Sequence, residues 1–266
     1  MKIALVGYGK MGHMLESTAL SLGDEVVATI DVFAPDASVK VSAGDGAAVA
    51  RAVKESGAEG VIEFTHPSSV MENIRALVPL GLPLVVGTTG WTDCEKEVAE
   101  LAAKTGGSGM HSANFSIGVN LFYKIVEEAS RLVSNFDEYD SAVWEMHHNQ
   151  KADSPSGTAL EIARRVMAGN PRKTSMVTDA FHSRPSPEQL HVSSTRCGHV
   201  PGTHTVFFDS AADTIELTHT ARSRQGFASG AVHALENLKR MLDSGGFNVR
   251  CFPWNVLNFF CYHAEN

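Results

Sequence analysis

Residues 145–159, with the sequence EMHHNQKADSPSGTA, bring together several side chains that can move protons. A strand-like run over residues 141–146 would place His147 and His148 at the end of a strand. Histidine titrates near neutral pH, so either ring could donate a proton, and Lys151 adds a second cationic donor. So many polar groups are rare in a core segment because each must be solvated or paired when buried. This run therefore predicts a proton-donating site at a strand end.

The second half of the same run predicts a binding site for an anion. Ser156 or Thr158 would cap the start of a helix, whose apolar pattern continues over residues 159–168. A helix start offers free backbone N–H groups and partial positive charge, both of which favour a carboxylate or a phosphate. The alternative interpretation is a polar loop before a capped helix, without a chemical role.

A second pattern, at the N-terminus, is typical of dinucleotide binding. Residues 2–6 form a short apolar strand, residues 7–12 read GYGKMG, and residues 11–22 have helical spacing. A strand over residues 25–30 then ends at Asp31, about twenty residues after the glycines. The glycines would let the backbone approach a pyrophosphate, and the carboxylate would bind ribose hydroxyls. The alternative interpretation is a tight turn at the glycines and an Asp31 that has no role in binding.

The residues after Asp31 bear on the choice of cofactor. Residues 32–34 are Val, Phe and Ala, so no arginine or lysine follows the carboxylate directly. A 2′-phosphate would meet the negative charge without a cation from these residues, so the sequence favours NADH over NADPH.

Strands and helices continue to alternate along the first half of the chain. Strand-like runs at residues 60–64, 83–86 and 109–112 alternate with helical runs at residues 47–56, 70–80 and 94–104. This order predicts a doubly wound parallel sheet of the Rossmann type, which binds ligands at the carboxyl ends of its strands. Thr65, residues 87–90 and residues 113–116 all fall at such ends.

The second half of the chain has a different pattern. A long amphipathic helix is predicted over residues 121–133, and strands over residues 190–195, 204–208 and 214–219. Their alternation suits a mixed or antiparallel sheet with one covered face, so a second α+β domain is expected. A helix over residues 227–242 could return to the first domain. His204 and His219 lie in predicted strands and are interpreted as structural.

Composition limits the class of protein. The net charge of −8 argues against a nucleic-acid partner, and no apolar run is long enough for a membrane span. The four cysteines are widely spread without a CxxC pair, and no His, Cys or Asp spacing indicates a metal site. The N-terminus lacks the layout of a signal peptide, so a cytoplasmic location is expected.

Several motifs occur together in one order. Residues 145–159 fit the pattern E-x-H-H-x-x-K-x-D-x-P-S-G-T-A. Other matches are residues 63–67 (EFTHP), 87–90 (GTTG), 113–120 (ANFSIGVN), 219–224 (HTARSR) and 227–231 (FASGA), together with Arg196, Gly198, Gly202 and His204. With these residues the chain resembles the dihydrodipicolinate reductase family over almost its whole length.

The resemblance implies a function and a domain organisation. The reaction would be the NAD(P)H-dependent reduction of 4-hydroxy-tetrahydrodipicolinate to tetrahydrodipicolinate in lysine and diaminopimelate biosynthesis. Residues 1–113 and 228–266 would form the dinucleotide-binding domain, and residues 114–227 the substrate-binding and oligomerisation domain of a homotetramer. The substrate would be a small dicarboxylate.

The resemblance also implies roles for individual residues. His147 would give a proton to the substrate carbon and Lys151 would be the second donor, while His148, Gly157 and Thr158 would bind the substrate. The cofactor would be held by three loops: Gly7, Tyr8, Gly9, Lys10, Met11, Gly12 and Asp31; Gly87, Thr88 and Thr89; and Ala113, Asn114, Phe115 and Ser116.

Three features depart from the family pattern, and two other functions are rivals to the one that the resemblance implies. The glycine loop is shorter than in many relatives, the tail at residues 245–266 is longer and more aromatic, and Asp31 lacks the basic follower of members that also use NADPH. A two-domain oxidoreductase for another imino or amino acid would keep the cofactor half but lack the run at residues 145–159. A redox sensor that only binds dinucleotide would have no need of His147 and Lys151.

Overall fold

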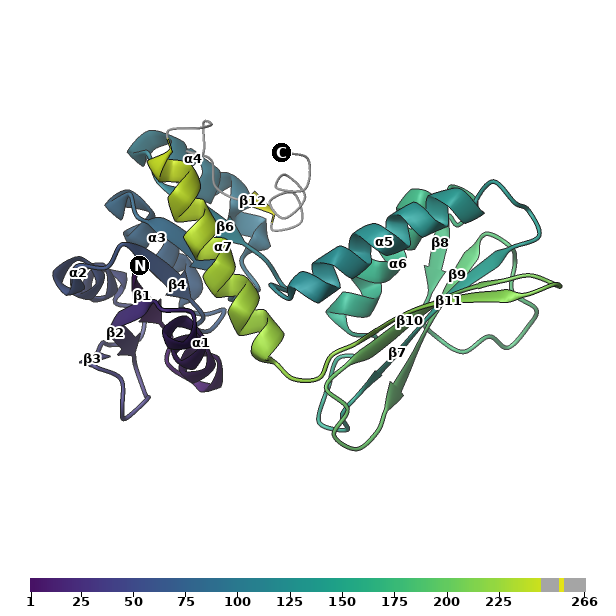
Figure 1. Cartoon of the computed structure of the whole chain (residues 1–266), viewed down its shortest axis with the longest axis horizontal. Coiled ribbons are helices and arrows are strands. Elements are labelled where there is room, and N and C mark those ends of the chain that lie inside the picture. The colour runs from purple at the N-terminus through teal and green to yellow at the C-terminus, as the bar shows by residue number, and fades with distance from the viewer. Residues whose placement is uncertain (245–253, 256–266) are drawn as a thin grey trace. The chain divides into compact units, whose positions relative to one another are not determined.

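The computed structural model describes residues 1–244 and the backbone of residues 254–255. The chain forms two compact units, Met1–Ile117 with Gln225–Asn266 and Gly118–Arg224 (Figure 1). The divisions therefore fall after Ile117 and after Arg224, a few residues from the expected positions after residues 113 and 227. The predicted aromatic tail lies outside the described residues, apart from the backbone of residues 254–255.

Unit 1 is built on a seven-stranded sheet in which every pair of neighbouring strands is parallel. The strand order is β12-β6-β5-β4-β1-β2-β3. The strands are β1 (Lys2–Val6), β2 (Glu25–Asp31), β3 (Val39–Lys40), β4 (Gly60–Glu63), β5 (Pro83–Val86), β6 (Ser108–His111) and β12 (Trp254–Asn255). This arrangement confirms the predicted Rossmann-type sheet.

Both faces of this sheet are covered because its strands are apolar on both sides. Ala4 and Val6 of β1 join a core with α2, α3 and α4, whereas Ile3 and Leu5 join a core with α1 and α7. The helices are α1 (Lys10–Ser21), α2 (Gly46–Ser56), α3 (Val70–Leu77), α4 (Glu95–Thr105) and α7 (Gln225–Asp243), with 3₁₀ turns η1 (Val78–Leu80) and η2 (Thr92–Cys94).

Unit 2 contains a five-stranded mixed sheet in the order β11-β10-β7-β9-β8. β10 pairs antiparallel with β11 and β7, whereas β9 pairs parallel with β7 and β8. Figure 1 shows α5 and α6 together on one face of this sheet. The elements are α5 (Ile117–Val133), β7 (Asp140–His147), α6 (Gly157–Gly169), β8 (Ser175–Val177), β9 (Gln189–Arg196), β10 (Thr203–Asp209) and β11 (Thr214–Thr220).

The central strand β7 alternates between buried and half-buried residues from Ser141 to His147. Because side chains on a strand alternate between faces, Glu145 and His147 share the buried face with Val143. This confirms the expected α+β unit with one covered sheet face. In the described part of the chain no helix is both long and apolar enough to cross a membrane.

Candidate active site

The glycine loop between β1 and α1 has the geometry of a pyrophosphate cradle. Gly7 has a φ of +93°, and a Cβ there would lie 2.1 Å from the carbonyl oxygen of Phe64. A Cβ on Gly12 would lie 2.5 Å from the carbonyl oxygen of Gly7, so this glycine permits close packing of α1. A Cβ on Gly9, the N-cap residue of α1, would meet nothing within 4 Å. The three glycines thus serve a tight turn, helix packing and an open approach for a ligand.

Asp31 stands at the end of β2 beside this loop. Its Oδ2 accepts a hydrogen bond from the Tyr8 N–H at 2.6 Å, and its Oδ1 accepts from the N–H groups of Phe33 and Ala34 at 2.6 and 2.8 Å. Partial burial acts to raise the pKa of Asp31, but these three donors and the charge of Lys40 together lower it. The carboxylate is therefore anionic and keeps acceptor capacity for ribose hydroxyls.

Lys40 is a cation near Asp31 that sequence reasoning missed. It lies nine residues further along, but the parallel pairing of β3 with β2 puts Lys40 directly opposite Asp31. Its ammonium donates a hydrogen bond to the Ala34 carbonyl oxygen. The two-residue strand β3 gives too short a pattern to predict, so no signal in the sequence indicated this pairing.

The ends of β4 and β5 are joined by hydrogen bonds. The Thr65 N–H donates to the Thr88 hydroxyl at 2.7 Å, and the Gly87 N–H donates to the Glu63 carbonyl oxygen at 2.9 Å. The Glu63 carboxyl group is fully buried, which raises its pKa, and it accepts hydrogen bonds from the Thr65 hydroxyl and from Asn73. These contacts hold two of the predicted cofactor loops in a fixed arrangement.

The third predicted cofactor loop follows β6. The Asn114 side chain accepts a hydrogen bond from the Ser116 N–H at 2.9 Å, and the Ser112 hydroxyl donates to the Asn114 carbonyl oxygen at 2.8 Å. The side chain of Phe115 is buried in the core of unit 1, so a cofactor could contact only its backbone. Thr89, by contrast, is exposed.

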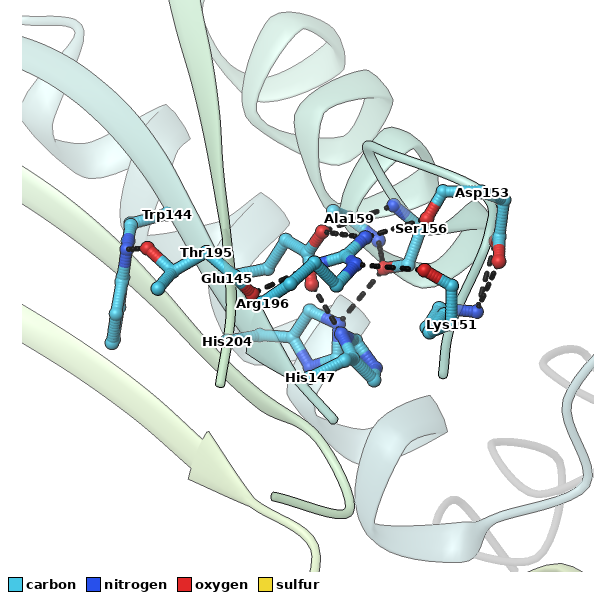
Figure 2. A network of polar contacts seen from close by, with 10 residues as sticks. All are labelled: Trp144, Glu145, His147, Lys151, Asp153, Ser156, Ala159, Thr195, Arg196 and His204. Carbon is cyan, nitrogen blue, oxygen red and sulfur yellow. Dashed lines mark hydrogen bonds and ion pairs between the residues drawn. The ribbon is translucent and has the colours of Figure 1, made fainter. Parts of the chain in front are cut away.

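In unit 2, His147 ends β7 and is held by a buried carboxylate. Glu145, two residues earlier on the same face, is fully buried, and its Oε2 contacts His147 Nδ1 (Figure 2). Burial acts to raise the pKa of Glu145, but hydrogen bonds from His147 and Arg196 outweigh it and lower the pKa to about 2. Glu145 is therefore an anion at neutral pH, and an imidazolium at His147 has a charged partner.

Arg196 pairs with the other oxygen of this carboxylate. The parallel register of β9 with β7 places Arg196 opposite His147, and its guanidinium lies 2.8 Å from Glu145 Oε1. The same guanidinium donates to the carbonyl oxygens of Lys151 at 3.3 Å and Asp153 at 2.5 Å. Arg196 therefore links the carboxylate to the loop that carries Lys151.

His204 reaches the same cluster from β10. The antiparallel register places it opposite Glu145, and its ring lies 5.1 Å from the His147 ring, centroid to centroid. Its Nε2 is 3.3 Å from the Ser156 hydroxyl. Burial and the neighbouring His147 lower the pKa of His204 to about 3, so its ring is neutral. His204 thus lies beside the His147 ring.

The predicted anion cradle at the start of α6 already contains a carboxylate. Asp153 accepts a hydrogen bond from the Lys151 ammonium at 2.9 Å, and the N–H of Gly157 also contributes to the lowered pKa of Asp153. A Cβ on Gly157 would meet nothing within 4 Å, so the space above this helix start is open. Lys151 thus lies at the cradle and pairs with Asp153.

Ser156, one of the two residues predicted to cap this helix, is the N-cap of α6. Its hydroxyl accepts a hydrogen bond from the Ala159 N–H at 3.2 Å, and its own N–H donates to Glu145 Oε1 at 3.3 Å. The helix start is therefore joined to the carboxylate that holds His147. His148 is half-buried at the strand end, and Thr158 is half-buried in the first turn of α6.

Two family models match the chain. The model "Dihydrodipicolinate reductase, N-terminus" matches residues 1–115, and "Dihydrodipicolinate reductase, C-terminus" matches residues 118–249. The chain belongs to the dihydrodipicolinate reductase family. The boundary between the two matches falls close to the division between units 1 and 2.

Relatives in this family are similar over nearly their full lengths. The 4-hydroxy-tetrahydrodipicolinate reductase of Archaeoglobus fulgidus is 37% identical over 255 residues, which cover 93% of this chain and 97% of that protein. The same enzyme of Christiangramia forsetii is 34% identical over 239 residues, covering 90% and 92%. The dipicolinate-bound dihydrodipicolinate reductase of Paenisporosarcina sp. TG-14 has the same fold, with a TM-score of 0.72, 23% identity and coverage of 90% and 95%.

In this member of the dihydrodipicolinate reductase family, cross-strand pairing also assembles a possible metal-ligand set. Among the described residues, Glu145, His147 and His204 offer ligand atoms that all lie within 4.8 Å of one another. The spacing of these residues in the sequence does not indicate a metal site, because they lie on two strands far apart in the chain. Arg196 already balances the charge of Glu145, so a dication here would add two uncompensated positive charges to a buried site.

Proposed function

We propose that this chain reduces 4-hydroxy-tetrahydrodipicolinate to tetrahydrodipicolinate with NAD(P)H, in lysine and diaminopimelate biosynthesis, and that His147 donates the proton. Overall the substrate takes up a hydride and a proton and loses water. The observation that carries the proposal is the Glu145–His147 pair at the end of β7, beside an anion cradle, in a chain that both family models match.

The proposed donor suits the chemistry. Hydride attack on a conjugated imine leaves electron density that must be protonated elsewhere on the ring. A histidine side chain can supply that proton near neutral pH, and the Glu145 carboxylate contacts the His147 ring. Lys151 is proposed as the second donor, near the developing charge.

The proposed substrate is a dicarboxylate, and the cradle at the start of α6 supports this assignment. Lys151 and the Gly157 N–H already meet on the carboxylate of Asp153, so their spacing suits a carboxylate ligand. We propose that Gly157 and Thr158 bind a ring carboxylate and that His148 is a further substrate contact. The dipicolinate bound by the Paenisporosarcina enzyme is a ligand of this chemical class.

The cofactor is proposed to bind to unit 1 and supplies the hydride from its nicotinamide. Its adenosine half would lie against residues 7–12 and Asp31, and the ribose and nicotinamide against residues 87–89 and 113–116. The open space at Gly9 and the anionic Asp31 fit this group. Asp31 favours NADH, and Lys40 opposite it gives NADPH a cation for its 2′-phosphate.

We further propose that unit 1 is the dinucleotide-binding domain, and that unit 2 binds substrate and forms a homotetramer through its sheet in the cytoplasm. Helices α5 and α6 cover one face of that sheet, and the opposite face carries the half-buried Trp144 and Phe207. A face of this kind is suited to burial against another subunit. Sedimentation of the full chain as a monomer would refute the tetramer.

The test of the activity follows NADH absorbance with enzymatically generated 4-hydroxy-tetrahydrodipicolinate. We expect turnover with both cofactors and a lower KM for NADH. Tight NADH binding without turnover would favour a redox sensor, and a clear preference for NADPH would refute the cofactor assignment.

A further inference from the structure

Charged groups from β7, β9 and the loop of Lys151 surround the proposed proton donor. We propose that Glu145 and Arg196 are positioning residues: Glu145 aims the imidazole of His147, and Arg196 fixes Glu145 and the loop of Lys151 as one unit. This inference rests on the proposed function, because it takes His147 and Lys151 as the two donors.

Glu145 determines which ring nitrogen of His147 is available. Its carboxylate contacts Nδ1, so an N–H there donates to Glu145, and Nε2 is left as the nitrogen that can face a substrate. A Cβ on Gly202 would lie 2.9 Å from Nε2, so glycine at this position keeps that nitrogen unobstructed. The burial of Glu145 excludes water from the pair, which makes the ring orientation well defined.

Arg196 holds three groups with one planar side chain. It pairs with Glu145 Oε1 and donates to the carbonyl oxygens of Lys151 and Asp153 (Figure 2). Its fourth contact, to the carbonyl oxygen of Thr195 at 2.9 Å, fixes it to its own strand. The Arg196 guanidinium therefore holds the backbone of Lys151 in a fixed position relative to Glu145, the carboxylate that orients His147. A lysine could not reproduce this, because its ammonium is one compact group.

The charged and titratable groups around His147 come from three strands, a loop and helix α6. Glu145 on β7 is the anion in contact with the ring; Arg196 on β9 and Lys151 in the loop are cations; Asp153 is paired with Lys151. His204 on β10 is neutral, and α6 contributes the uncharged Ser156. Among these groups, Glu145 is the anion that contacts the His147 ring.

The first test compares the kcat of Glu145→Gln with that of wild type. We expect kcat per folded enzyme, with the folded fraction taken from thermal unfolding, to fall about 10- to 100-fold at neutral pH. Glu216→Gln is the matched control, because Glu216 is exposed on β11 of the same sheet. A kcat per folded enzyme equal to that of wild type in Glu145→Gln would overturn the role of Glu145, since a purely structural residue would change only the folded fraction.

The second test does not need turnover. In ¹⁵N NMR spectra of histidine-labelled full-length protein, the neutral His147 ring should carry its proton on Nδ1 in wild type, and Glu145→Gln should lose that preference. The same tautomer in both proteins would overturn the proposal. Absence of activity in wild type would instead refute the proposed function and leave this measurement interpretable.

The third test separates the role of Arg196. Arg196→Lys should raise the substrate KM and lower kcat, each about tenfold or more, because the loop of Lys151 and the carboxylate of Glu145 both lose their anchor. Arg172→Lys is the matched control, since Arg172 also binds loop carbonyl oxygens, those of Phe136, Asp137 and Tyr139, at the start of β7. If both variants changed the substrate KM and kcat equally, Arg196 would have only a structural role, and its assignment as a positioning residue would be overturned.

Discussion

Two alanine substitutions in the glycine loop, only three residues apart, should have different consequences. Gly9→Ala adds a methyl group where nothing in the protein lies within 4 Å, and Gly9 has an extended backbone conformation that alanine can adopt. Gly12→Ala adds the same group 2.5 Å from the Gly7 carbonyl oxygen, well inside the 3.4 Å at which ordinary contact begins. We therefore expect Gly9→Ala to impair ligand binding and Gly12→Ala to impair folding.

The magnitudes follow from these distances. Alanine at the N-cap position of α1 costs about 1 kcal/mol or less, whereas the methyl group would occupy the space proposed for the pyrophosphate. A tenfold rise in the Kd for NADH, about 1.4 kcal/mol, is the smallest effect we expect for Gly9→Ala. For Gly12→Ala the overlap should cost about 1–3 kcal/mol, which lowers Tm by several degrees at about 2–4 °C per kcal/mol.

The assays are fluorescence titration with NADH and thermal unfolding without nucleotide, both on the full chain. Gly9→Ala should unfold within a few degrees of wild type and bind NADH weakly, while Gly12→Ala should unfold early. NADH affinity within twofold of wild type for Gly9→Ala would refute the placement of the pyrophosphate at this loop. An unchanged Tm for Gly12→Ala would refute the packing argument.

Three further predictions concern single side chains. His147→Gln should lower kcat about 100- to 10,000-fold and leave NADH affinity unchanged, and near-normal turnover would remove its role as donor. Lys40→Ala should raise the KM for NADPH several-fold more than that for NADH; an unchanged ratio of the two KM values would exclude Lys40 from cofactor selection. The depressed pKa of His204, about 3, means that the unfolded chain takes up a proton at higher pH than the folded one. The free energy of unfolding should therefore fall as pH drops from about 6.5 toward about 3, with a slope of up to about 1.4 kcal/mol per pH unit. Urea titrations at several pH values should measure this slope, and it should be smaller in His204→Gln.

The strong periodic elements could be predicted from the sequence because their signals are local. The strands β1 and β5 begin and end at the predicted residues, and α6 starts directly after the predicted cap Ser156. The helix predicted over residues 70–80 changes to a 3₁₀ turn at Val78–Leu80, where a proline near the start of that turn cannot continue the α-helical hydrogen bonds. The two-residue strand β3 had no recognisable pattern, and α5 starts at Ile117 rather than at residue 121.

The site was predictable where its residues are consecutive and not where they meet through the sheet. His147, Lys151 and the start of α6 lie within one run of sequence, so the sequence predicts that they are neighbours. Arg196 and His204 reach Glu145 only through the parallel register of β9 and the antiparallel register of β10. A single chain gives no direct information on strand order, so their roles could not be derived from their positions. Lys40 was missed for the same reason.

The carboxylate of Asp153 has a consequence for how this protein meets other anions. It is tethered two residues from Lys151, so its local concentration at that ammonium far exceeds that of free ions in solution. A stray phosphate or acetate must displace this built-in competitor with only one charged group of its own. A ligand with two carboxylates can gain a second contact elsewhere when the first displaces Asp153. We therefore expect free acetate or phosphate to compete weakly at this site, and a dicarboxylate to bind better than a monocarboxylate.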